Sequence, residues 1–547
     1  MSGQRVFELS KGKVGGSLPF PGRWAVRAVD PEAAGRIAAE LDAPLLMGKL
    51  LALRGFSDGS QARVFLDARL DGLHDPFLMK GMEEAVSHLV HTIKSEQPIG
   101  VYGDYDVDGI SAASLLFSFF RALGVRVPYY IPNRMREGYG LHSQGLEHLL
   151  SQGCSTVVTV DCGISSFHAV AEAARMGIHL IVTDHHSPSE RVPDAFAVLN
   201  PLQPGCGYPF KGLCGVGVAF KLATAVRRRL REEGFQGELP NLKQFLDFVA
   251  LGTVADVVPL IDENHIFVRT GLEILSPTQG RQDASLSVTD SRKAGIRALQ
   301  TVADLKEDSL TASHIGFVLA PRLNAAGRVG DPNVGVELLT SENLTQARVH
   351  AERLEEWNRQ RRELQEEAFK MAVGQLEIEP PLEEKMTIVL ASDRWHPGVI
   401  GIVASKLVEK YGRPAVLIHL DGNEGKGSGR SVPSFHLYDA LRRCSDLLLQ
   451  FGGHKEAAGL SIRRESVDAF RQQFEKIAEE FIEPGFFEPE LELDAAVDFS
   501  DLRYPLVERL ERMAPFGTGN PQPVFGTAGV EMAGSPQFVG RDGSHLK

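Results

Sequence analysis

The stretch "STVVTVDCGISSFHAVAEAARMGIHLIVTDHH", residues 155–186, decides the fold of this chain. It begins with an apolar, Val-rich run, continues with an Ala-rich helical run that ends at Gly177, and closes with a second apolar run. A strand, a helix and a strand in that order predict a βαβ unit with two parallel strands. Because apolar residues are continuous in both strands, we expect a sheet that is covered on both faces.

The same alternation extends on both sides of this unit. Strand-like runs at 98–103 and 125–132 flank a helical run at 111–124. A further helical run covers 145–153, and another strand-like run covers 195–200. Strands that alternate with helices along the chain are typical of α/β proteins with a parallel sheet. We therefore expect this class.

The rest of the chain divides at polar segments. Residues 280–295 are polar and lack apolar periodicity, so we expect a surface insertion there. Residues 341–377 are rich in Leu, Glu, Arg and Ala, contain no Pro, and predict one long helix between two lobes. A second β/α unit begins at 386, and residues 483–490 mark a further boundary.

Composition restricts the class of protein. A chain of 547 residues suggests about three or four domains. The net charge of −13 argues against a uniformly basic surface but leaves room for a local basic groove. The five cysteines form no C-x-x-C pair, which argues against a disulfide framework and a structural zinc site. With no apolar leader and no long apolar run, we expect a cytoplasmic protein without membrane contact.

Acidic and imidazole side chains follow three of the predicted strands. They are Asp104, Asp106 and Asp108 after the first strand, Asp161 after the second, and Asp184, His185 and His186 after the third. Ligands of open α/β sheets bind beyond the carboxyl ends of the strands, where these side chains would meet. Asp256 is the only charged residue in the apolar stretch 248–260, and burial of a lone carboxylate is costly unless a cation compensates it.

Each of these signals also has an ordinary explanation. A single Asp after a strand is more often a cap or a turn residue. "GDYDVDG" resembles a calcium loop, but the Glu that closes such a loop is missing, and Ala113 and Ser114 occupy that region. Several coincidences at one sheet edge favour a metal site. Carboxylate and imidazole ligands suit Mn²⁺ or Mg²⁺ better than zinc, and their number predicts two divalent ions acting on a phosphoryl group.

Polar and basic residues in Gly-rich or Pro-containing segments are candidates for phosphate binding. They are Arg134 and Arg136 in 132–141, Arg322 and Arg328 in 320–332, Lys426, Ser428 and Arg430 in 424–437, and His454 in 451–459. We interpret 320–332 and 424–437 as loops. In such a loop, backbone N–H groups and a hydroxyl can bind a phosphate while an Arg contacts it bidentately. Each loop taken alone is equally compatible with an ordinary turn.

In combination, these motifs resemble the DHH phosphoesterase superfamily and, within it, the bacterial exonucleases specific for single-stranded DNA. The resemblance covers nearly the whole chain and is carried, in this order, by "YGDYDVDG", "PNRMREGYGL", "VDCGIS", "TDHH", "GTVADVVPL", "PRLNAAGR", "HPGVIGIVASKL", "GSGRS", "GGHKEAAG" and "APFGTGNPQPVF". It implies an N-terminal extension (1–75), a DHH catalytic domain (76–340), a connecting helix (341–378), a smaller α/β DHHA1 domain (379–482) and a truncated OB-fold-like β segment (483–547).

The resemblance also implies roles for single residues. The metal ligands would be Asp104, Asp106, Asp108, Asp161, His185 and Asp256. Among these, Asp108, Asp161 and His185 would form the catalytic set together with His186, which would lie beside the scissile phosphate. Asp184 would orient the imidazoles. Arg134 and Arg328 would contact backbone phosphates, and Ser428, Arg430 and His454 would bind the nucleic-acid end.

The implied activity is the 5′→3′ release of 5′-mononucleotides from single-stranded DNA, with two Mn²⁺ or Mg²⁺ ions, in DNA repair and recombination. The implied partners are the 5′ end of single-stranded DNA, a single-strand-binding protein and a RecQ-type helicase, and we expect a monomer. One departure is that Tyr102 and Asp104 stand where the pyrophosphatase branch of the superfamily has a His ahead of its D-x-D.

Two other functions stay open. The first is a DHH-family phosphoesterase that acts on short oligonucleotides or pAp, although such chains are shorter and lack the N-terminal extension and the OB-like segment. The second is a catalytically inactive relative that serves as a replication scaffold. Proteins of that kind lose the acids and the His pair, which this chain retains.

Overall fold

The computed structural model of the chain describes residues 6–7, 23–276, 293–305, 309–378, 385–481, 490–530, 534–535, 537–539 and 545–546. The contacts divide the chain into two compact units. The smaller unit comprises 1–67, 488–516 and 520–547, and the larger unit comprises 68–487 and 517–519. Residues 280–292 of the expected insertion and 483–489 of the expected boundary lie outside the described residues.

The larger unit contains a five-stranded sheet of order β4-β3-β5-β6-β7 in which every described pairing is parallel. Its strands are β3 (Ile99–Gly103), β4 (Tyr129–Tyr130), β5 (Thr156–Val160), β6 (His179–Thr183) and β7 (Ala197–Leu199). The predicted α/β class with a parallel sheet is therefore confirmed. The strand expected at 125–132 is shorter than predicted.

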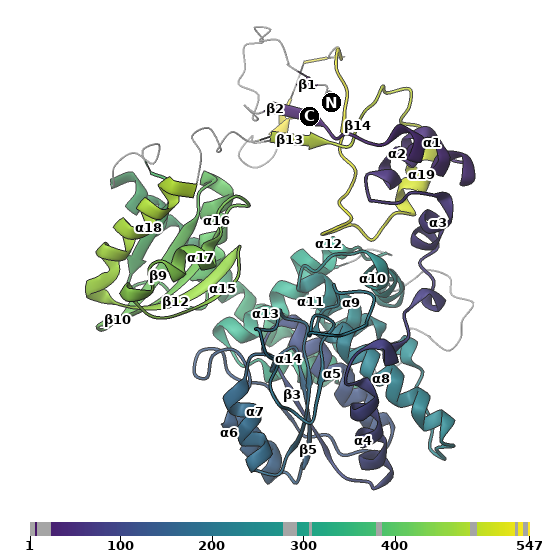
Figure 1. Ribbon diagram of the computed structural model, residues 1–547. Helices are drawn as coiled ribbons and strands as arrows, with labels where there is room; N and C mark the ends of the chain where they lie inside the picture. The colour runs from purple at the N-terminus through teal and green to yellow at the C-terminus, as the bar shows by residue number, and fades with distance from the viewer. Residues whose placement is uncertain are drawn as a thin grey trace. The chain divides into compact units, whose positions relative to one another are not determined.

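Helices cover both faces of this sheet (Figure 1). On one face lie α6 (Ser143–Ser151) and α7 (Phe167–Arg175), and on the other lie α4 (Met82–Lys94), α5 (Val107–Ala122) and α8 (Gly215–Glu232). Successive side chains of a strand point to opposite faces of the sheet. Val157 and Leu180 therefore pack with α6 and α7, whereas Val158 and Ile181 pack with the helices of the other face. This two-sided burial explains why the strands are apolar throughout.

Further helices complete the core on the α5 and α8 side. They are α9 (Leu246–Ala255), α10 (Asp262–Leu275), α11 (Ala294–Val302), α12 (Ala312–His314), a π-helical turn (Ile315–Leu319), α13 (Ala320–Val329) and α14 (Asn333–Leu339). The interpretation of 320–332 as a loop was wrong, because most of it forms α13. Pro321 stands just after the π-helical turn, and such turns often stand where a residue without an N–H interrupts the regular hydrogen bonding of a helix.

The predicted long helix is confirmed as α15 (Leu344–Ile378). Beyond it, a second sheet has the order β11-β12-β10-β9-β8, with β8 and β9 parallel and the other pairs antiparallel. Its elements are β8 (Ile388–Ser392), α16 (Ile400–Tyr411), β9 (Ala415–Asp421), β10 (Glu424–Arg430), α17 (Leu437–Arg442), β11 (Leu448–Gly453), β12 (Ala457–Arg463) and α18 (Val467–Phe481).

The Gly-Ser segment at 424–430 is a central strand of this sheet, so its interpretation as a loop was wrong. Its glycines alternate with polar residues and occupy the buried face of β10. A Cβ at Gly425 would lie 2.7 Å from Ile418 Cγ2, and one at Gly427 would lie 2.7 Å from Leu460 Cδ1. Glycine is therefore needed at these positions because neighbouring side chains pack closely against the backbone, and not because the chain turns there. Ser428 and Arg430 consequently point to the opposite face.

The smaller unit combines short strands with a helical core. Its elements are β1 (Val6–Phe7), β2 (Arg23–Val26), α1 (Pro31–Glu40), α2 (Leu45–Ala52), α3 (Gly59–Asp67), β13 (Glu490–Leu493), β14 (Ala495–Ala496), α19 (Tyr504–Glu511), β15 (Phe525–Gly526), β16 (Phe538–Val539) and β17 (His545–Leu546). Residues far apart in the chain meet in its core, where Ile37, Leu50 and Phe65 pack with Met513.

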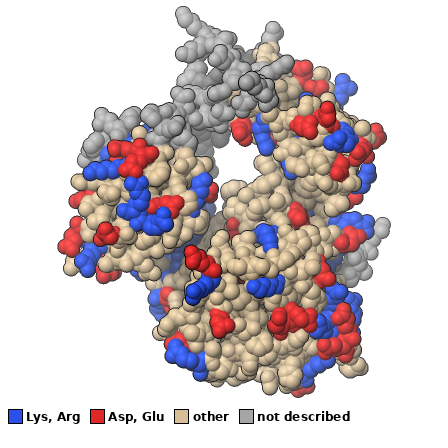
Figure 2. Space-filling view, viewed as in Figure 1, with Lys and Arg blue, Asp and Glu red and all other residues tan. Residues whose placement is uncertain are grey.

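The surface of the larger unit is mixed in charge. Figure 2 shows Lys and Arg side chains interspersed with Asp and Glu over the face that it presents, so the net charge of −13 is not gathered into one acidic surface there. Among the residues that the structure describes, no helix has both the length and the apolar character needed to span a bilayer.

A buried ion pair ties α8 to α10. Lys221 Nζ lies 2.5 Å from Glu263 Oε1, and the two side chains are 1% and 0% exposed. Lys221 also donates to the carbonyl of His74 at 2.6 Å, and the Tyr208 hydroxyl donates to Glu263 at 2.5 Å. The pair therefore also fixes the segment that precedes α4.

We predict that Lys221→Met destabilises the larger unit by about 3–5 kcal/mol, because it leaves the Glu263 carboxylate buried without its cation. The urea midpoint and the melting temperature measure this loss. Lys94→Met serves as the control, since it breaks a pair with Glu233 in which both side chains are about 40% exposed and should cost about 1 kcal/mol or less. Equal losses in the two variants would contradict the prediction.

Candidate metal centre and nucleic-acid interface

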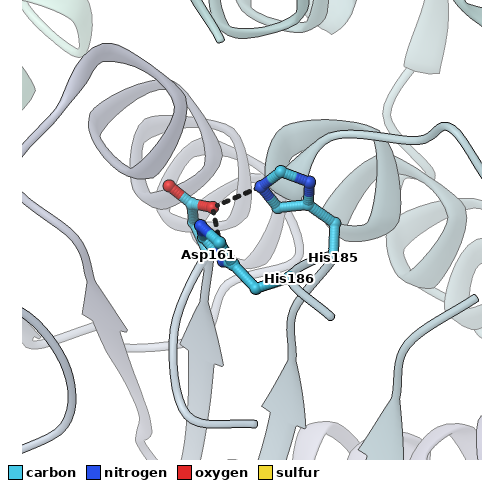
Figure 3. A group of neighbouring side chains, drawn as sticks. All are labelled: Asp161, His185 and His186. Carbon is cyan, nitrogen blue, oxygen red and sulfur yellow. Dashed lines mark ion pairs between the residues drawn. The ribbon is translucent and has the colours of Figure 1, made fainter. Parts of the chain in front are cut away.

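The acids and imidazoles singled out in the sequence meet beyond the carboxyl ends of three neighbouring strands. Asp104 follows β3, Asp161 follows β5, and His185 and His186 follow β6. In Figure 3, the side chains of Asp161, His185 and His186 point toward one another from two adjacent strands. The N-cap of α5 is Asp106, whose carboxylate accepts the N–H of Gly109 at 3.0 Å.

His185 lies at the middle of the acids. Its Nε2 is 3.1 Å from Asp161 Oδ1, 3.5 Å from Asp256 Oδ2 and 3.8 Å from Asp108 Oδ2. Asp256 reaches this point from the C-terminal end of α9. Three sets of potential ligand atoms each lie within 4.8 Å of one another: Asp161 with His185 and His186, Asp108 with His185 and Asp256, and Asp104 with Asp106 and Asp161. The shared Asp161 and His185 join them into one centre.

Two helices approach this centre closely. Asp108 accepts the N–H groups of Gly215 at 2.6 Å and Val216 at 2.9 Å, both at the start of α8. A Cβ at Gly215 would lie 2.6 Å from Asp161 Cβ, and one at Gly252, on α9, would lie 2.5 Å from Asp108 Oδ1. Real Cβ atoms do not come so near to other atoms. The centre therefore requires glycine at both positions.

Asp184 is saturated by donors of the protein. It accepts the N–H of Ile164 at 2.9 Å, of His185 at 2.8 Å and of His186 at 3.1 Å, and its Oδ1 lies 2.8 Å from His186 Nδ1. Burial would raise the pKa of Asp184, but the hydrogen bond and charge of His186 and the backbone donors outweigh it and lower the pKa below its ordinary value. Asp184 thus orients His186.

In Asp104, Asp108, Asp161 and Asp256, hydrogen bonds and positive charges do not outweigh burial. Burial, followed by repulsion from neighbouring carboxylates, raises the pKa of Asp104 and Asp161 well above the ordinary value, that of Asp108 to about 7 and that of Asp256 to about 9. A bound cation relieves this kind of repulsion, because it favours the ionised form of every carboxylate around it.

The two imidazoles differ in their charge. Burial and the charge of His186 lower the pKa of His185 to about 4, so His185 is neutral, as a metal ligand must be. Burial would also lower the pKa of His186, but the hydrogen bond and charge of Asp184 raise it to about 9.

The donor atoms of the centre fit a hard divalent cation. Asp104 Oδ1, Asp161 Oδ1 and His185 Nε2 are buried and have no hydrogen-bond partner among the described residues. Buried polar atoms almost always have a partner, so these three need one that the chain itself does not provide. Carboxylate oxygens with an imidazole nitrogen suit Mn²⁺ or Mg²⁺.

Basic residues gather beside this centre. The Arg134 guanidinium lies over the ring of Tyr105, 5.3 Å from its centroid. Burial, together with the charges of Arg134, Arg361 and Arg430, lowers the pKa of Arg328 to about 9. Burial and Arg134 also lower the pKa of Arg430. These arginines repel one another at short range. A bound anion would relieve that repulsion, so the cluster is a candidate anion site.

Ser428 and Arg430 converge with the start of α16. Arg430 Nη1 donates to Ser428 Oγ at 3.2 Å. A Cβ at Gly401, the second residue of α16, would lie 2.8 Å from Ser428 Oγ and 3.0 Å from Arg430 Nη2. A hydroxyl, a guanidinium and a helix N-terminus are thus brought together, and such an arrangement binds phosphate.

Three of the expected phosphate contacts have different surroundings. Arg322 forms an ion pair with Glu355 of α15 and donates to the carbonyl of Val318 at 2.6 Å, so the protein itself engages its guanidinium. The side chains of Arg136 and His454 are exposed.

Several contributors were missed in the sequence. Arg361 lies in a charged run that is typical of a solvated helix face, yet its side chain is half-buried and its charge reaches Arg328. Tyr139 contacts His186, and Gly215 and Gly252 provide room for the acids. For Tyr139, the sequence offered a signal in the Gly-Tyr-Gly run at 138–140, which is typical of a turn that presents its central side chain.

Models of three protein families match the chain. They are the DHH family N-terminal domain at residues 98–253, the DHHA1 domain at 384–480 and the RecJ OB domain at 493–547. The first match contains the parallel sheet with most of the acids, and the second contains the mixed sheet with Ser428 and Arg430. The third places an OB region at the C-terminal end of the matched sequence.

The chain is also similar to single proteins. It is 39% identical over 498 residues to the single-stranded-DNA-specific exonuclease RecJ of Dickeya dadantii, covering 88% of this chain and 83% of that protein. It is 36% identical over 503 residues to the RecJ of Bacillus subtilis, covering 92% of this chain but 61% of that protein. Crystal structures of Thermus thermophilus RecJ with Mn²⁺ and with Mg²⁺ match with TM-scores of 0.77 and 0.71, at 31% and 30% identity, covering 92% of this chain and 69% and 67% of those chains.

The fold and the centre define a metal-dependent phosphoesterase of the DHH/DHHA1 class. Within that class, the 39% identity to the Dickeya dadantii exonuclease, over most of both chains, indicates one particular family. The chain belongs to the RecJ family of single-stranded-DNA-specific exonucleases.

We predict that Gly252→Ala lowers the affinity for Mn²⁺ by roughly 10-fold or more, because the added methyl group displaces the Asp108 carboxylate. Titration calorimetry of the purified protein measures this affinity. Gly316→Ala is the matched control, since its Cβ would come no nearer than 3.7 Å to any other group, at Val254 Cγ1. Unchanged affinity in Gly252→Ala would show that Asp108 does not bind the ion.

Proposed function

We propose that the chain removes 5′-mononucleotides stepwise from the 5′ end of single-stranded DNA, using two divalent ions. The observation that carries this proposal is a set of buried acceptors without partners, at Asp104 and Asp161, beside the half-buried guanidiniums of Arg328 and Arg430. Cations bound to the acceptors and a phosphate bound to the guanidiniums would give both sets of groups a partner.

The ions would be held by Asp104, Asp106, Asp108, Asp161, His185 and Asp256. The relatives of known structure contain Mn²⁺ or Mg²⁺, which supports these two metals here. When bound, the ions supply Lewis-acid polarisation of the phosphodiester and lower the pKa of an attacking water. Since the donor set exceeds the needs of one ion, we infer two.

The other residues would bind and orient the strand. Asp184 fixes the ring of His186, which would face the scissile phosphate. Arg134 and Arg328 would neutralise backbone phosphates. A terminal 5′-phosphate held by Ser428 and Arg430 would place the first phosphodiester over the acids, and this is a physical cause for 5′→3′ polarity.

By likeness to its relatives, we extend the proposal to DNA repair and recombination in the cytoplasm. A single-strand-binding protein and a RecQ-type helicase are the partners that we would test first, with the chain as a monomer. The retained acid cluster disfavours an inactive scaffold. Selective cleavage of very short oligonucleotides or pAp would favour the smaller phosphoesterases instead.

The deciding experiment is digestion of single-stranded oligonucleotides labelled at either end, with Mn²⁺ and with EDTA. We expect early release of a labelled mononucleotide from the 5′ end alone, blocked by EDTA and absent on duplex DNA. Asp161→Ala and His185→Ala should lower turnover on the order of 10³-fold with an unchanged circular dichroism spectrum, because each removes a ligand. Near-normal turnover of either variant with Mn²⁺ would overturn the two-ion assignment.

Arg430→Ala tests the 5′-phosphate contact. We expect the kcat/KM for 5′-phosphorylated DNA to fall about 10–100-fold, as for a lost charge-assisted hydrogen bond, and that for 5′-hydroxyl DNA to fall much less. Arg463→Ala, at the exposed end of β12, is the control and should leave both unchanged. Equal losses on both substrates would mean that Arg430 supports the fold of the second sheet.

A further inference from the structure

The segment 132–141 reaches the metal centre through Tyr139. The Tyr139 hydroxyl donates to the backbone carbonyl of Asp161 at 3.3 Å and lies 3.1 Å from Nδ1 of His186. The two rings meet edge to face, with centroids 5.6 Å apart and planes at 67°. None of the functions assigned above uses this hydroxyl.

The hydrogen bonds at His186 define which ring nitrogen carries the proton. Nδ1 lies 2.8 Å from the carboxylate of Asp184, which only accepts when ionised. Nδ1 is therefore protonated whether the ring is neutral or charged. The oxygen of Tyr139 can accept a share of the same N–H while its own proton goes to the Asp161 carbonyl. This arrangement leaves Nε2 outside both contacts.

The segment that bears Tyr139 is firmly anchored. The carboxylate of Glu137 accepts the N–H of Asn133 at 2.7 Å and the hydroxyl of Tyr130 at 2.7 Å. Tyr102 donates its hydroxyl to the carbonyl of Gly140 at 3.1 Å. Five residues before Tyr139 stands Arg134, over the ring of Tyr105. The candidate phosphate contact Arg134 and the hydroxyl that contacts the His186 imidazole thus belong to one hydrogen-bonded segment.

We propose that Tyr139 is a positioning residue: its hydroxyl fixes the rotation of the His186 ring so that Nε2 faces the phosphodiester bound by Arg134. This inference rests on the proposed function. A tyrosine that only packed would not need its hydroxyl, and the Tyr139 side chain is 47% exposed, so packing alone explains little of its placement.

Tyr139→Phe removes the one oxygen and keeps the ring. We expect kcat on single-stranded DNA to fall about tenfold, the worth of one hydrogen bond, while KM and the affinity for Mn²⁺ stay within twofold. Tyr129→Phe is the matched control, because Tyr129 is half-buried on β4 and its ring packs against Phe117. A raised KM with unchanged kcat would make Tyr139 a DNA contact and overturn the proposal.

A double-mutant cycle separates the two hydrogen bonds of the hydroxyl. In a His186→Asn background, Tyr139→Phe should cost no further activity if Tyr139 acts through His186. A further tenfold loss in that background would mean that it acts through the Asp161 backbone, contrary to the proposal.

A crystal structure of metal-free Tyr139→Phe gives a readout that does not depend on activity. We expect the His186 ring to rotate away from its orientation in the unmodified chain or to occupy more than one orientation. A single, unmoved ring would overturn the proposal. If the unmodified chain degrades no DNA, the proposed exonuclease function fails, while this structure still decides whether Tyr139 positions His186.

Discussion

The carboxylate of Asp108 accepts two backbone N–H groups at the start of α8, and this contact brings three helices to one point. Asp108 belongs to α5, its donors Gly215 and Val216 open α8, and Gly252 of α9 packs against its oxygen. Burying a carboxylate is expensive, and peptide donors at a helix N-terminus are the cheapest compensation available. The remaining acids can then be arranged around a fixed neighbour.

Charge is distributed unevenly around this point. Asp104 and Asp161 each have a buried oxygen without a hydrogen-bond donor among the described residues, whereas Asp184 has several donors. Across from them, Arg328 on α13 and Arg430 on β10 are half-buried cations that form no ion pair with a described carboxylate. Each group is costly by itself. A phosphate between bound cations and guanidiniums would compensate both, and for this reason the proposed function links the two sheets of the larger unit to one substrate.

Much of this arrangement was predictable, and the reasons for the failures are specific. Continuous apolar runs identified the buried parallel strands, and parallel strands deliver the residues that follow them to one edge, so Asp161 and His185 were found without a structure. The glycines of β10 were misread because alternation with polar residues is common to flexible turns and to strands packed under large neighbours. The roles of single residues came from the family resemblance.

The placement of other residues depends on packing that the sequence does not show. The position of Asp256 depends on where α9 ends relative to α5, and this is set by packing between helices. The contact of Tyr139 with His186 depends on the path of a turn that Glu137 closes. Neither leaves a periodic pattern, because each involves only one side chain.

The acids come from widely separated positions, between Asp104 and Asp256, so the centre has the character of a cross-link. A shared ion would join β3, β5, β6 and α9 across loops of tens of residues, and the entropy lost in closing such loops slows the folding of parallel sheets. An ion that binds the assembled centre but not the unfolded chain would stabilise the folded state by its binding free energy. The carboxylate and imidazole groups proposed to bind the catalytic ions would then also stabilise the α/β core, and removal of the ions would weaken it.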